Sequence, residues 1–226
     1  MNLKTFYFGL TLTFGLPWLL FIVFPHFGFS GLAPVAYEIE EEALQSVYPA
    51  RTMAVVEGGS RVYAQEGCFQ CHTQVIRPEY AGTDTWREGW AGSLEEGTIR
   101  TTRPRDYLGE SYAHFGVQRL GPDLSNVGLR IQDRAWHYRH LYDPRSEVEW
   151  SSMPGFRHLF QKRKIQGQPS SEALRFPGEL QPEDGFEIVP TERAVALVDY
   201  LLALRKDQPI PASLLDSTTL AAQTSE

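Results

Sequence analysis

The stretch Glu66-Gly67-Cys68-Phe69-Gln70-Cys71-His72 decides how this chain folds. Its spacing, C-x-x-C-H, is that of a c-type haem attachment site. Two thiols three positions apart can each add to one vinyl group of a haem, and the next residue then places an imidazole on the iron. The motif therefore predicts one covalently bound haem c, with thioether bonds to Cys68 and Cys71 and with His72 as the first axial ligand.

Other uses of a close cysteine pair suit this sequence less well. A thioredoxin-like redox pair needs a βαβ context, which the sequence lacks. A zinc site normally needs a second pair of Cys or His ligands at knuckle spacing. Cys68 and Cys71 are the only two cysteines in the 226 residues, so no disulfide framework is expected.

An electron-transfer haem also needs a second axial ligand, and a methionine there raises the reduction potential by stabilising the reduced iron. Besides Met1, the chain has Met53, which precedes the attachment motif, and Met153, which lies in a loop between a serine pair and Pro-Gly. Met153 is the expected ligand, because such a loop can reach across the haem from the side opposite His72. A bis-histidine site is the alternative, and its candidates are His114, His137, His140 and His158.

A rigid turn, Gly121-Pro122-Asp123-Leu124, lies between the cysteines and Met153. An iron-bound imidazole needs a partner on its other ring nitrogen to fix its orientation, and a backbone carbonyl is a common one. The carbonyl of Pro122 is a candidate partner for His72. The alternative is that the segment is only a turn.

The N-terminal part of the chain is apolar. Residues 5–29 hold 25 residues without a formal charge. At a helical rise of about 1.5 Å per residue, such a stretch spans a hydrocarbon core of roughly 30 Å. We expect one transmembrane helix, kinked at Pro17 and ending near Pro25 and His26, with the lone Lys4 placing the N-terminus in the cytoplasm. A cleaved signal peptide is the alternative, and either outcome exports the rest of the chain.

Composition divides the chain further. We expect an anchor at residues 1–37, an acidic linker at 38–52, a haem domain at 53–206 and a flexible tail at 207–226. Two loop-rich insertions are expected inside the domain, because residues 79–118 are rich in Gly, Arg, Tyr and Trp without helical period and residues 157–190 are polar with several Gly and Pro. Loops of such length within a compact domain are usually functional. The 28 acidic against 21 basic side chains give a net charge of −7. This balance argues against nucleic acid as a partner and favours cationic proteins.

Three helices are predicted in the haem domain. A short one at 62–66 runs into the cysteine motif, and another covers 134–142 and ends before Pro144. The last begins at Pro190-Thr191, which is a helix start signal. Its apolar residues recur with helical spacing and should bury one face: Ala194, Leu197, Val198, Leu201 and Leu202.

These residues give the chain a resemblance to class I c-type cytochromes, and more narrowly to subunit II, the monohaem subunit, of the cbb3-type cytochrome c oxidases. The resemblance lies first in the run from Glu66 to Pro78, where the family shows E-G-C-x-x-C-H followed by S/T-Q-x-I-R-P, and within it Gln74 to Pro78 is far more specific than the haem motif alone. The resemblance covers about half of the chain and continues in short segments: Gly121-Pro122-Asp123-Leu124, Val127-Gly128 with Arg130, Trp136-His137, His140-Leu141, Asp143-Pro144-Arg145 and Ser152-Met153-Pro154.

The resemblance implies a mainly α fold, in which an N-terminal transmembrane helix precedes a class I cytochrome c-like helical domain with long loop insertions. It implies that Cys68 and Cys71 carry the haem, that His72 and Met153 are the axial pair, and that the Pro122 carbonyl meets His72. It also implies the partners, which are a haem-copper catalytic subunit, another c-type cytochrome subunit and a soluble cytochrome c donor, with membrane lipid around the anchor.

The implied function is electron relay by a non-catalytic, single-pass subunit of a bacterial inner membrane. Its haem domain would lie on the periplasmic side and pass single electrons to the catalytic subunit of a cbb3-type terminal oxidase. Two alternatives keep the electron-transfer role, namely a stand-alone anchored cytochrome and the cytochrome subunit of another respiratory complex. A third is a ligand-binding or redox-sensing haem protein with an open sixth position, which an absorption spectrum would distinguish.

Overall fold

The computed structural model describes residues 2–39, 44–50, 54–95, 97–176 and 180–215. The chain divides into two compact units. The first unit contains Met1–Pro49 with Arg103–Leu108, and the second contains Ala50–Thr102 with Gly109–Glu226.

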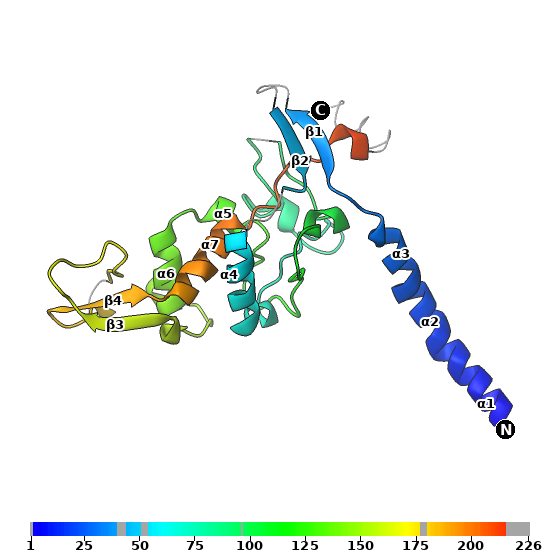
Figure 1. Cartoon of the computed structure of the whole chain (residues 1–226), viewed down its shortest axis with the longest axis horizontal. Helices are drawn as coiled ribbons and strands as arrows, with labels where there is room; N and C mark the ends of the chain where they lie inside the picture. Colours follow the sequence, from blue (N-terminus) through cyan, green and yellow to red (C-terminus); the bar gives the residue numbers. More distant parts are fainter. Residues whose placement is uncertain (1, 40–43, 51–53, 96, 177–179, 216–226) are drawn as a thin grey trace. The chain divides into compact units, whose positions relative to one another are not determined.

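One long helix, Leu3–Ser30, opens the first unit (Figure 1). Asn2 caps it, since its side chain accepts a hydrogen bond from Thr5 N at 2.8 Å. In the described part of the chain, this is the one helix that is long and apolar enough to cross a membrane, and its apolar stretch is not buried against protein. Phe8 and Phe21, for example, are 70% and 74% exposed. The expected apolar helix is present, and its exposed side chains suit contact with lipid.

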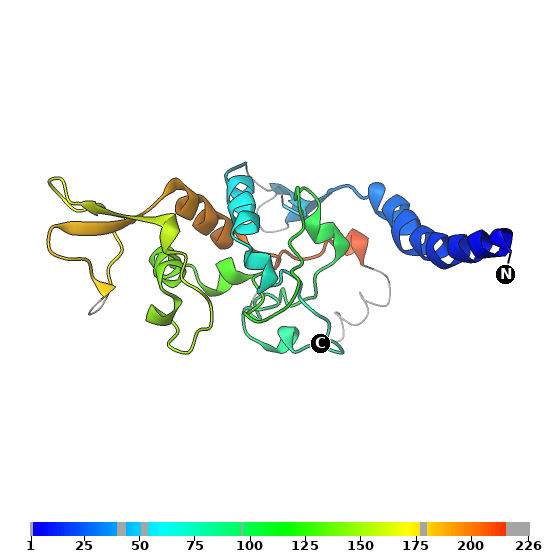
Figure 2. The same cartoon turned by 90° about the horizontal axis from the view of Figure 1, so that it is seen from below.

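Two prolines shape this helix without ending it. Segments α1 (Leu3–Leu10), α2 (Leu16–Trp18) and α3 (Phe24–Ser30) alternate with two wider π-helical segments, η1 (Thr11–Gly15) and η2 (Leu19–Val23). Pro17 and Pro25 each follow a π segment. A proline lacks an N–H and its ring presses on the carbonyl four residues earlier, so a wider turn relieves the clash. The helix curves along its length (Figure 2) and continues to Ser30, past the end predicted at Pro25 and His26.

An antiparallel hairpin follows the helix. Strand β1 (Val35–Ile39) pairs with β2 (Leu44–Tyr48), with Val35 opposite Tyr48. The Tyr48 ring is buried, and its hydroxyl donates to Asp106 Oδ1 at 2.8 Å, from the short turn η5 (Pro104–Tyr107). This differs from the acidic linker predicted at 38–52. Four glutamates make that stretch acidic, but strand pairing uses the backbone and buries only selected side chains.

The second unit has four α-helices and an antiparallel strand pair among its described residues (Figure 1). The helices are α4 (Ala54–Gln65), α5 (Val127–Arg130), α6 (Arg134–Tyr142) and α7 (Glu192–Ala203). The strands are β3 (Phe160–Lys164) and β4 (Phe186–Pro190), and the short turns are η3 (Cys68–Gln70), η4 (Asp84–Trp86), η6 (Pro144–Ser146), η7 (Arg157–Leu159) and η9 (Ala212–Leu214).

The predicted helices are present, with one change of length. Helix α6 has the predicted bounds, and α7 begins after Thr191, whose side chain accepts a hydrogen bond from Ala194 N. The buried residues of α7 include the predicted Ala194, Leu197, Val198 and Leu201, with Leu202 partly buried beside them. Helix α4 extends back to Ala54, well before the predicted start at Val62.

Helices α4 and α7 pack closely because glycines bring the backbones together (Figure 1). A Cβ at Gly59 of α4 would lie 2.0 Å from Ala196 O of α7. A Cβ at Gly128 of α5 would lie 2.1 Å from Leu202 O, which also belongs to α7. Distances below 3 Å leave no room for a methyl group, so both contacts require glycine.

The predicted insertions differ from one another. Residues 79–118 contain only short turns among their described residues, as expected of a loop. The segment 157–190 instead forms the β3–β4 hairpin (Figure 2) and contributes core residues, namely Leu159, Phe160, Leu174, Phe176 and Ile188. It is therefore not simply a polar surface insertion, because its few apolar side chains fold inward.

The C-terminal tail begins with residues that contact the second unit. Asp207 is 7% exposed and pairs with Arg205 at 2.7 Å. The side chain of Gln208 accepts a hydrogen bond from Ala50 N at 2.9 Å. The first two residues of the tail predicted as flexible from 207 therefore each have a polar partner. Residues 216–226 lie outside the described part of the chain.

Candidate functional site

The cysteine motif forms one tight turn after α4. Gly67 turns the chain with a positive φ of 72°, a conformation that costs a glycine little. The turn η3 follows, and His72 N donates to Cys68 O at 3.0 Å. Cys68, Cys71 and His72 are therefore brought together, and both thiols are free of a disulfide.

The environment of Cys68 argues against a reactive thiol pair. Burial, and to a lesser degree the nearby Glu66 carboxylate, raises the pKa of the Cys68 thiol to about 12. A redox or metal-binding cysteine needs its thiolate near neutral pH. Among the described residues, no group of three or more His, Cys, Asp or Glu side chains is arranged to hold a metal ion. The thioredoxin-like and zinc alternatives therefore gain no support.

His72 is held in one orientation by the turn at 121–124. Its Nδ1 lies 2.8 Å from Pro122 O, and because a carbonyl only accepts, Nδ1 carries the proton. The ring rests on Gly121, where a Cβ would lie 2.3 Å from His72 Cε1. Gly121 N in turn donates to Cys71 O at 2.9 Å. This arrangement leaves Nε2 as the nitrogen that can bind iron.

Burial makes His72 a neutral imidazole. It lowers the pKa of His72, and the hydrogen bond to Pro122 and the charge of Asp123 oppose this only in part. A neutral imidazole is the form that binds a metal. The state of the ring therefore suits an axial ligand.

A buried ionic network supports the same turn. Arg119 joins Asp84 and Asp123, which are 1% and 3% exposed. Arg77 adds a second cation on Asp84, with Nη2 3.0 Å from Oδ1. Burial alone would raise the pKa of Asp84, but the hydrogen bonds from Arg77 and Arg119 outweigh it and lower the pKa to about 2. Asp84 is therefore ionised, and both carboxylates are paired with Arg119.

Met153 lies on a loop fastened to the end of α6. Phe156 N donates to Leu141 O at 2.7 Å, and a Cβ at Gly155 would lie 2.7 Å from Tyr142 O. Met153 is partly buried and packs against the same hydrophobic core as Cys68. Met53, the other methionine considered as a ligand, lies outside the described residues.

Three of the four alternative histidines already have hydrogen-bond partners. His114 Nε2 lies 2.8 Å from Ser60 Oγ, His137 Nε2 lies 2.9 Å from Ile131 O, and His158 Nε2 lies 2.7 Å from Glu66 Oε2. His140 differs, because its Nδ1 is buried and has no partner among the described residues. Its ring stacks on Trp136 with centroids 4.6 Å apart.

The pKa of His140 is also perturbed. Burial is the main cause and lowers the pKa of His140 to about 4, with a smaller contribution from repulsion by His72 and His137 when they are protonated, so the imidazole is neutral near pH 7. A neutral ring with an unpartnered nitrogen is free to bind a further group. Of the four histidines named as alternatives, His140 is thus the one with a fully buried ring nitrogen that lacks a hydrogen-bond partner among the described residues.

The polar groups near His72 fit a haem. Arg130 is largely buried, and burial lowers its pKa while Asp123 opposes this. Its guanidinium carbon lies 4.7 Å from the centroid of the Trp90 ring, and its Nη2 donates a hydrogen bond to Asp123 O. Its Nε has no hydrogen-bond partner, and among the described residues no carboxylate forms an ion pair with Arg130. A buried cation without an anion is costly. The carboxylates of a haem would supply the anion for Arg130, and an iron would take the free nitrogen of His72.

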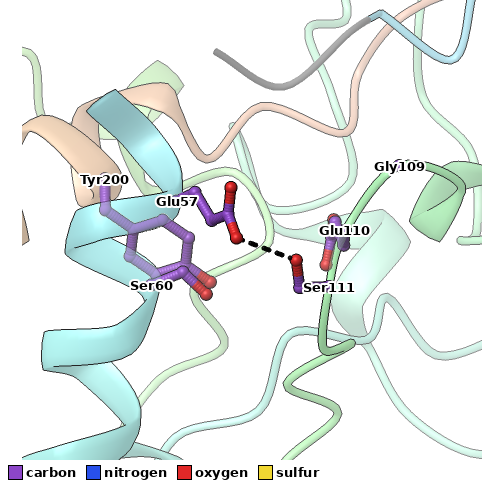
Figure 3. A pocket seen from close by; sticks show the side chains of 6 residues that line it. All are labelled: Glu57, Ser60, Gly109, Glu110, Ser111 and Tyr200. Atoms are coloured by element: carbon purple, nitrogen blue, oxygen red, sulfur yellow. Dashed lines mark hydrogen bonds between the residues drawn. The ribbon is translucent and has the colours of Figure 1, made fainter. Parts of the chain in front are cut away.

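Two cavities lie elsewhere in the second unit. One, of about 40 Å³, is lined by Glu57, Ser60, Gly109, Glu110, Ser111 and Tyr200, and Ser111 Oγ donates to Glu57 there at 3.1 Å (Figure 3). It has room for water but not for a cofactor. The other is an open apolar groove of about 440 Å³ along Ala64, Phe69 and residues 112–117. His72 and Met153 line neither cavity.

Sequence reasoning missed part of the site. Arg119 and Asp84 lie in a stretch without periodicity, and nothing in composition distinguishes a buried charge from a solvated one. The clearest available signal was Arg77, which belongs to the specific run from Gln74 to Pro78 and binds Asp84.

Comparison with known proteins gives one family. The model of the family described as cytochrome C oxidase, mono-heme subunit/FixO, matches residues 13–176. The match spans well over half of the chain and includes the cysteine turn, Pro122 and Met153. A search of curated proteins found no match.

Proposed function

Because the chain belongs to the FixO family of mono-haem cytochrome c oxidase subunits, we propose that it relays electrons to the catalytic subunit of a cbb3-type terminal oxidase. The observation that carries the proposal is the C-x-x-C-H turn whose histidine is fixed by Pro122 O at 2.8 Å. That turn lies inside the family match. The subunit itself makes and breaks no substrate bonds in this role.

In this proposal, the haem supplies reversible one-electron chemistry between its ferric and ferrous states. Cys68 and Cys71 would bind it covalently, His72 and Met153 would be the two protein ligands of its iron, and Pro122 would fix the His72 ring. Arg130 would pair with a haem carboxylate. A rigid ligand set suits electron transfer, because the geometry then changes little between the two oxidation states.

The placement in the membrane is also proposed. The exposed apolar helix Leu3–Ser30 would cross the inner membrane once, with Lys4 on the cytoplasmic side and the second unit in the periplasm. There the chain would receive electrons from a soluble cytochrome c or another c-type subunit. The acceptor would be the haem-copper subunit of the same complex.

The first experiment tests the cofactor. The full chain is expressed with a cytochrome c maturation system, denatured, and separated on a gel that is stained for haem. The pigment should stay with the wild-type chain and be lost from the variant in which both Cys68 and Cys71 are alanine. Pigment that leaves the denatured wild-type chain would overturn the covalent assignment.

The second experiment tests the complex. The chain carries an affinity tag at its C-terminus and is purified in mild detergent from a bacterium that expresses it with its oxidase. A haem-copper subunit with haem b should purify with it, and reduced haem c in the complex should be oxidised by oxygen. A chain that purifies with haem c but without such a partner would favour a stand-alone cytochrome.

A further inference from the structure

We propose that Arg119 is a positioning residue that raises the reduction potential of the haem on His72, by neutralising Asp123 and holding together the two loops that carry His72 and Pro122. The inference rests on the proposed function, since it requires an iron on His72. It assigns a role to a side chain that contacts neither the cysteines nor His72.

The contacts of Arg119 use all three guanidinium nitrogens. Nε donates to Thr73 Oγ1 at 2.7 Å, and Nη2 donates to Val75 O at 2.7 Å and to Asp123 Oδ2 at 3.0 Å. Nη1 lies 2.6 and 2.8 Å from the two carboxylate oxygens of Asp84. The side chain is 15% exposed. Such a planar fork holds its partners in fixed geometry, which a flexible lysine does not do.

Those partners flank the hydrogen bond between His72 and Pro122. Thr73 follows His72 in the chain, and Asp123 follows Pro122. Asp123 Oδ2 also accepts from Thr73 Oγ1 at 2.6 Å and from Val75 N at 2.9 Å. Leu124 N donates to Thr73 O at 2.8 Å. The two loops are therefore cross-linked immediately after His72 and Pro122, and Arg119 binds both of them there.

Charge gives the direction of the effect. Oxidised haem iron carries one more positive charge than reduced iron, so a nearby carboxylate stabilises the oxidised form and lowers the potential. Asp123 is 3% exposed, which leaves its charge little screened by water. The cation of Arg119, 3.0 Å from that carboxylate, offsets it. Without Arg119 the negative charge beside the ligand loop would act on the iron.

Arg77 provides a matched control. Its side chain binds Asp84, as Arg119 does, but it forms no hydrogen bond or ion pair with the described residues 72–75 and 121–124, and it is 39% exposed. Replacing it by glutamine removes the same charge from the same network. Arg119 would remain on Asp123 in that variant.

The experiment measures midpoint potentials by spectroelectrochemical titration of the haem-loaded full chain. Arg119→Gln should lower the potential, with the equilibrium between oxidised and reduced forms changing on the order of tenfold, or about 59 mV for one electron. Arg77→Gln should produce less than about a third of that shift. Arg119→Lys, which keeps the charge, should recover part of it, and the double variant Arg119→Gln with Asp123→Asn should recover most of it.

The inference fails if Arg119→Gln leaves the potential unchanged, if Arg77→Gln shifts it equally, or if the double variant does not recover. A haem stain and a thermal melt accompany each variant. If Arg119→Gln does not fold, the midpoint potentials of Arg119→Lys and of the double variant are compared with that of wild type. Arg119→Lys keeps the positive charge, and the double variant removes the positive and the negative charge together. Failure of the proposed function is distinguishable, because the wild-type chain would then carry no covalent haem.

Discussion

His72 Nδ1 donates a hydrogen bond to Pro122 O at 2.8 Å, joining residues 50 positions apart in the chain. This bond fixes the tautomer of the imidazole and turns Nε2 toward the space where an iron would bind. Gly121 makes it possible, since any side chain there would strike the His72 ring. The orientation of the ligand is thus set by backbone atoms rather than by a replaceable side chain.

Gly121→Ala should disturb that orientation. The new Cβ would lie 2.3 Å from His72 Cε1, so either the ring or the turn must move. Overpacking of this kind typically costs about 1–3 kcal/mol. We expect haem to remain attached through its thioethers, while denaturant unfolding followed at the haem absorption band shows a loss of stability in that range.

Pro122→Ala is the control for that substitution. It changes the neighbouring residue but keeps the carbonyl that accepts from His72 Nδ1, so the hydrogen bond should persist. Its cost should be smaller than that of Gly121→Ala. Equal losses in the two variants would show that the turn as a whole, and not the contact with the imidazole, determines stability.

The second axial ligand can be tested by opening the sixth position. Met153→Ala should produce a reduced haem that binds carbon monoxide, because the iron then lacks a ligand, whereas wild type should not bind it. His140→Phe should leave the sixth ligand in place, although His140 has a free buried nitrogen. Carbon monoxide binding is read from the absorption spectrum.

If His140→Phe binds carbon monoxide and Met153→Ala does not, His140 is the sixth ligand. Met153→His then separates the cases further, because replacing a thioether by an imidazole should lower the potential by on the order of 0.1 V. An unchanged potential in Met153→His would show that residue 153 does not bind the iron.

The regular helices were predictable because their signals are local. The start signal at Thr191 and the apolar stripe of α7 lie within a dozen residues, and α6 was predicted with its observed bounds. The apolar helix at the N-terminus was equally clear, since length and absence of charge suffice. Its continuation past Pro25 was not, because whether a proline ends a helix depends on how the preceding turn relaxes.

The missed features depend on partners far apart in the sequence. The hairpin of β1 and β2 lies in an acidic segment, and the β3–β4 pair joins Phe160 to Pro190 across a long polar loop. Arg119 looks like any surface arginine until Asp84 and Asp123 are placed beside it. By contrast, the cysteine turn and Pro122 could be named in advance, since covalent haem attachment fixes residue types at fixed spacing.

Adjacent glycines of α4 offer a test of the packing against α7. Gly59→Ala places a Cβ 2.0 Å from Ala196 O, so the helices must separate. We expect a loss of several kcal/mol, on the order of 3 or more, by the overpacking argument. Gly58→Ala meets nothing within 4 Å and should be neutral or stabilising by up to about 1 kcal/mol, because alanine favours a helix. Thermal unfolding of both variants checks the pair, and similar losses would contradict the contact.

Acid should weaken the fold through Asp84. The pKa of its carboxyl is lowered from 3.8 to about 2, because hydrogen bonds from Arg77 and Arg119 outweigh its burial. The folded protein therefore binds this proton less readily than the unfolded chain, so roughly 2 kcal/mol of stability is present above about pH 4 and is lost as the pH falls to about 2. Denaturant unfolding measured from about pH 5 to about pH 2 should show that the free energy of unfolding falls more steeply with decreasing pH in wild type than in Asp84→Asn. Arg77→Gln, which removes one of the two cationic donors, should lie between them, and parallel curves for wild type and Asp84→Asn would contradict the assignment.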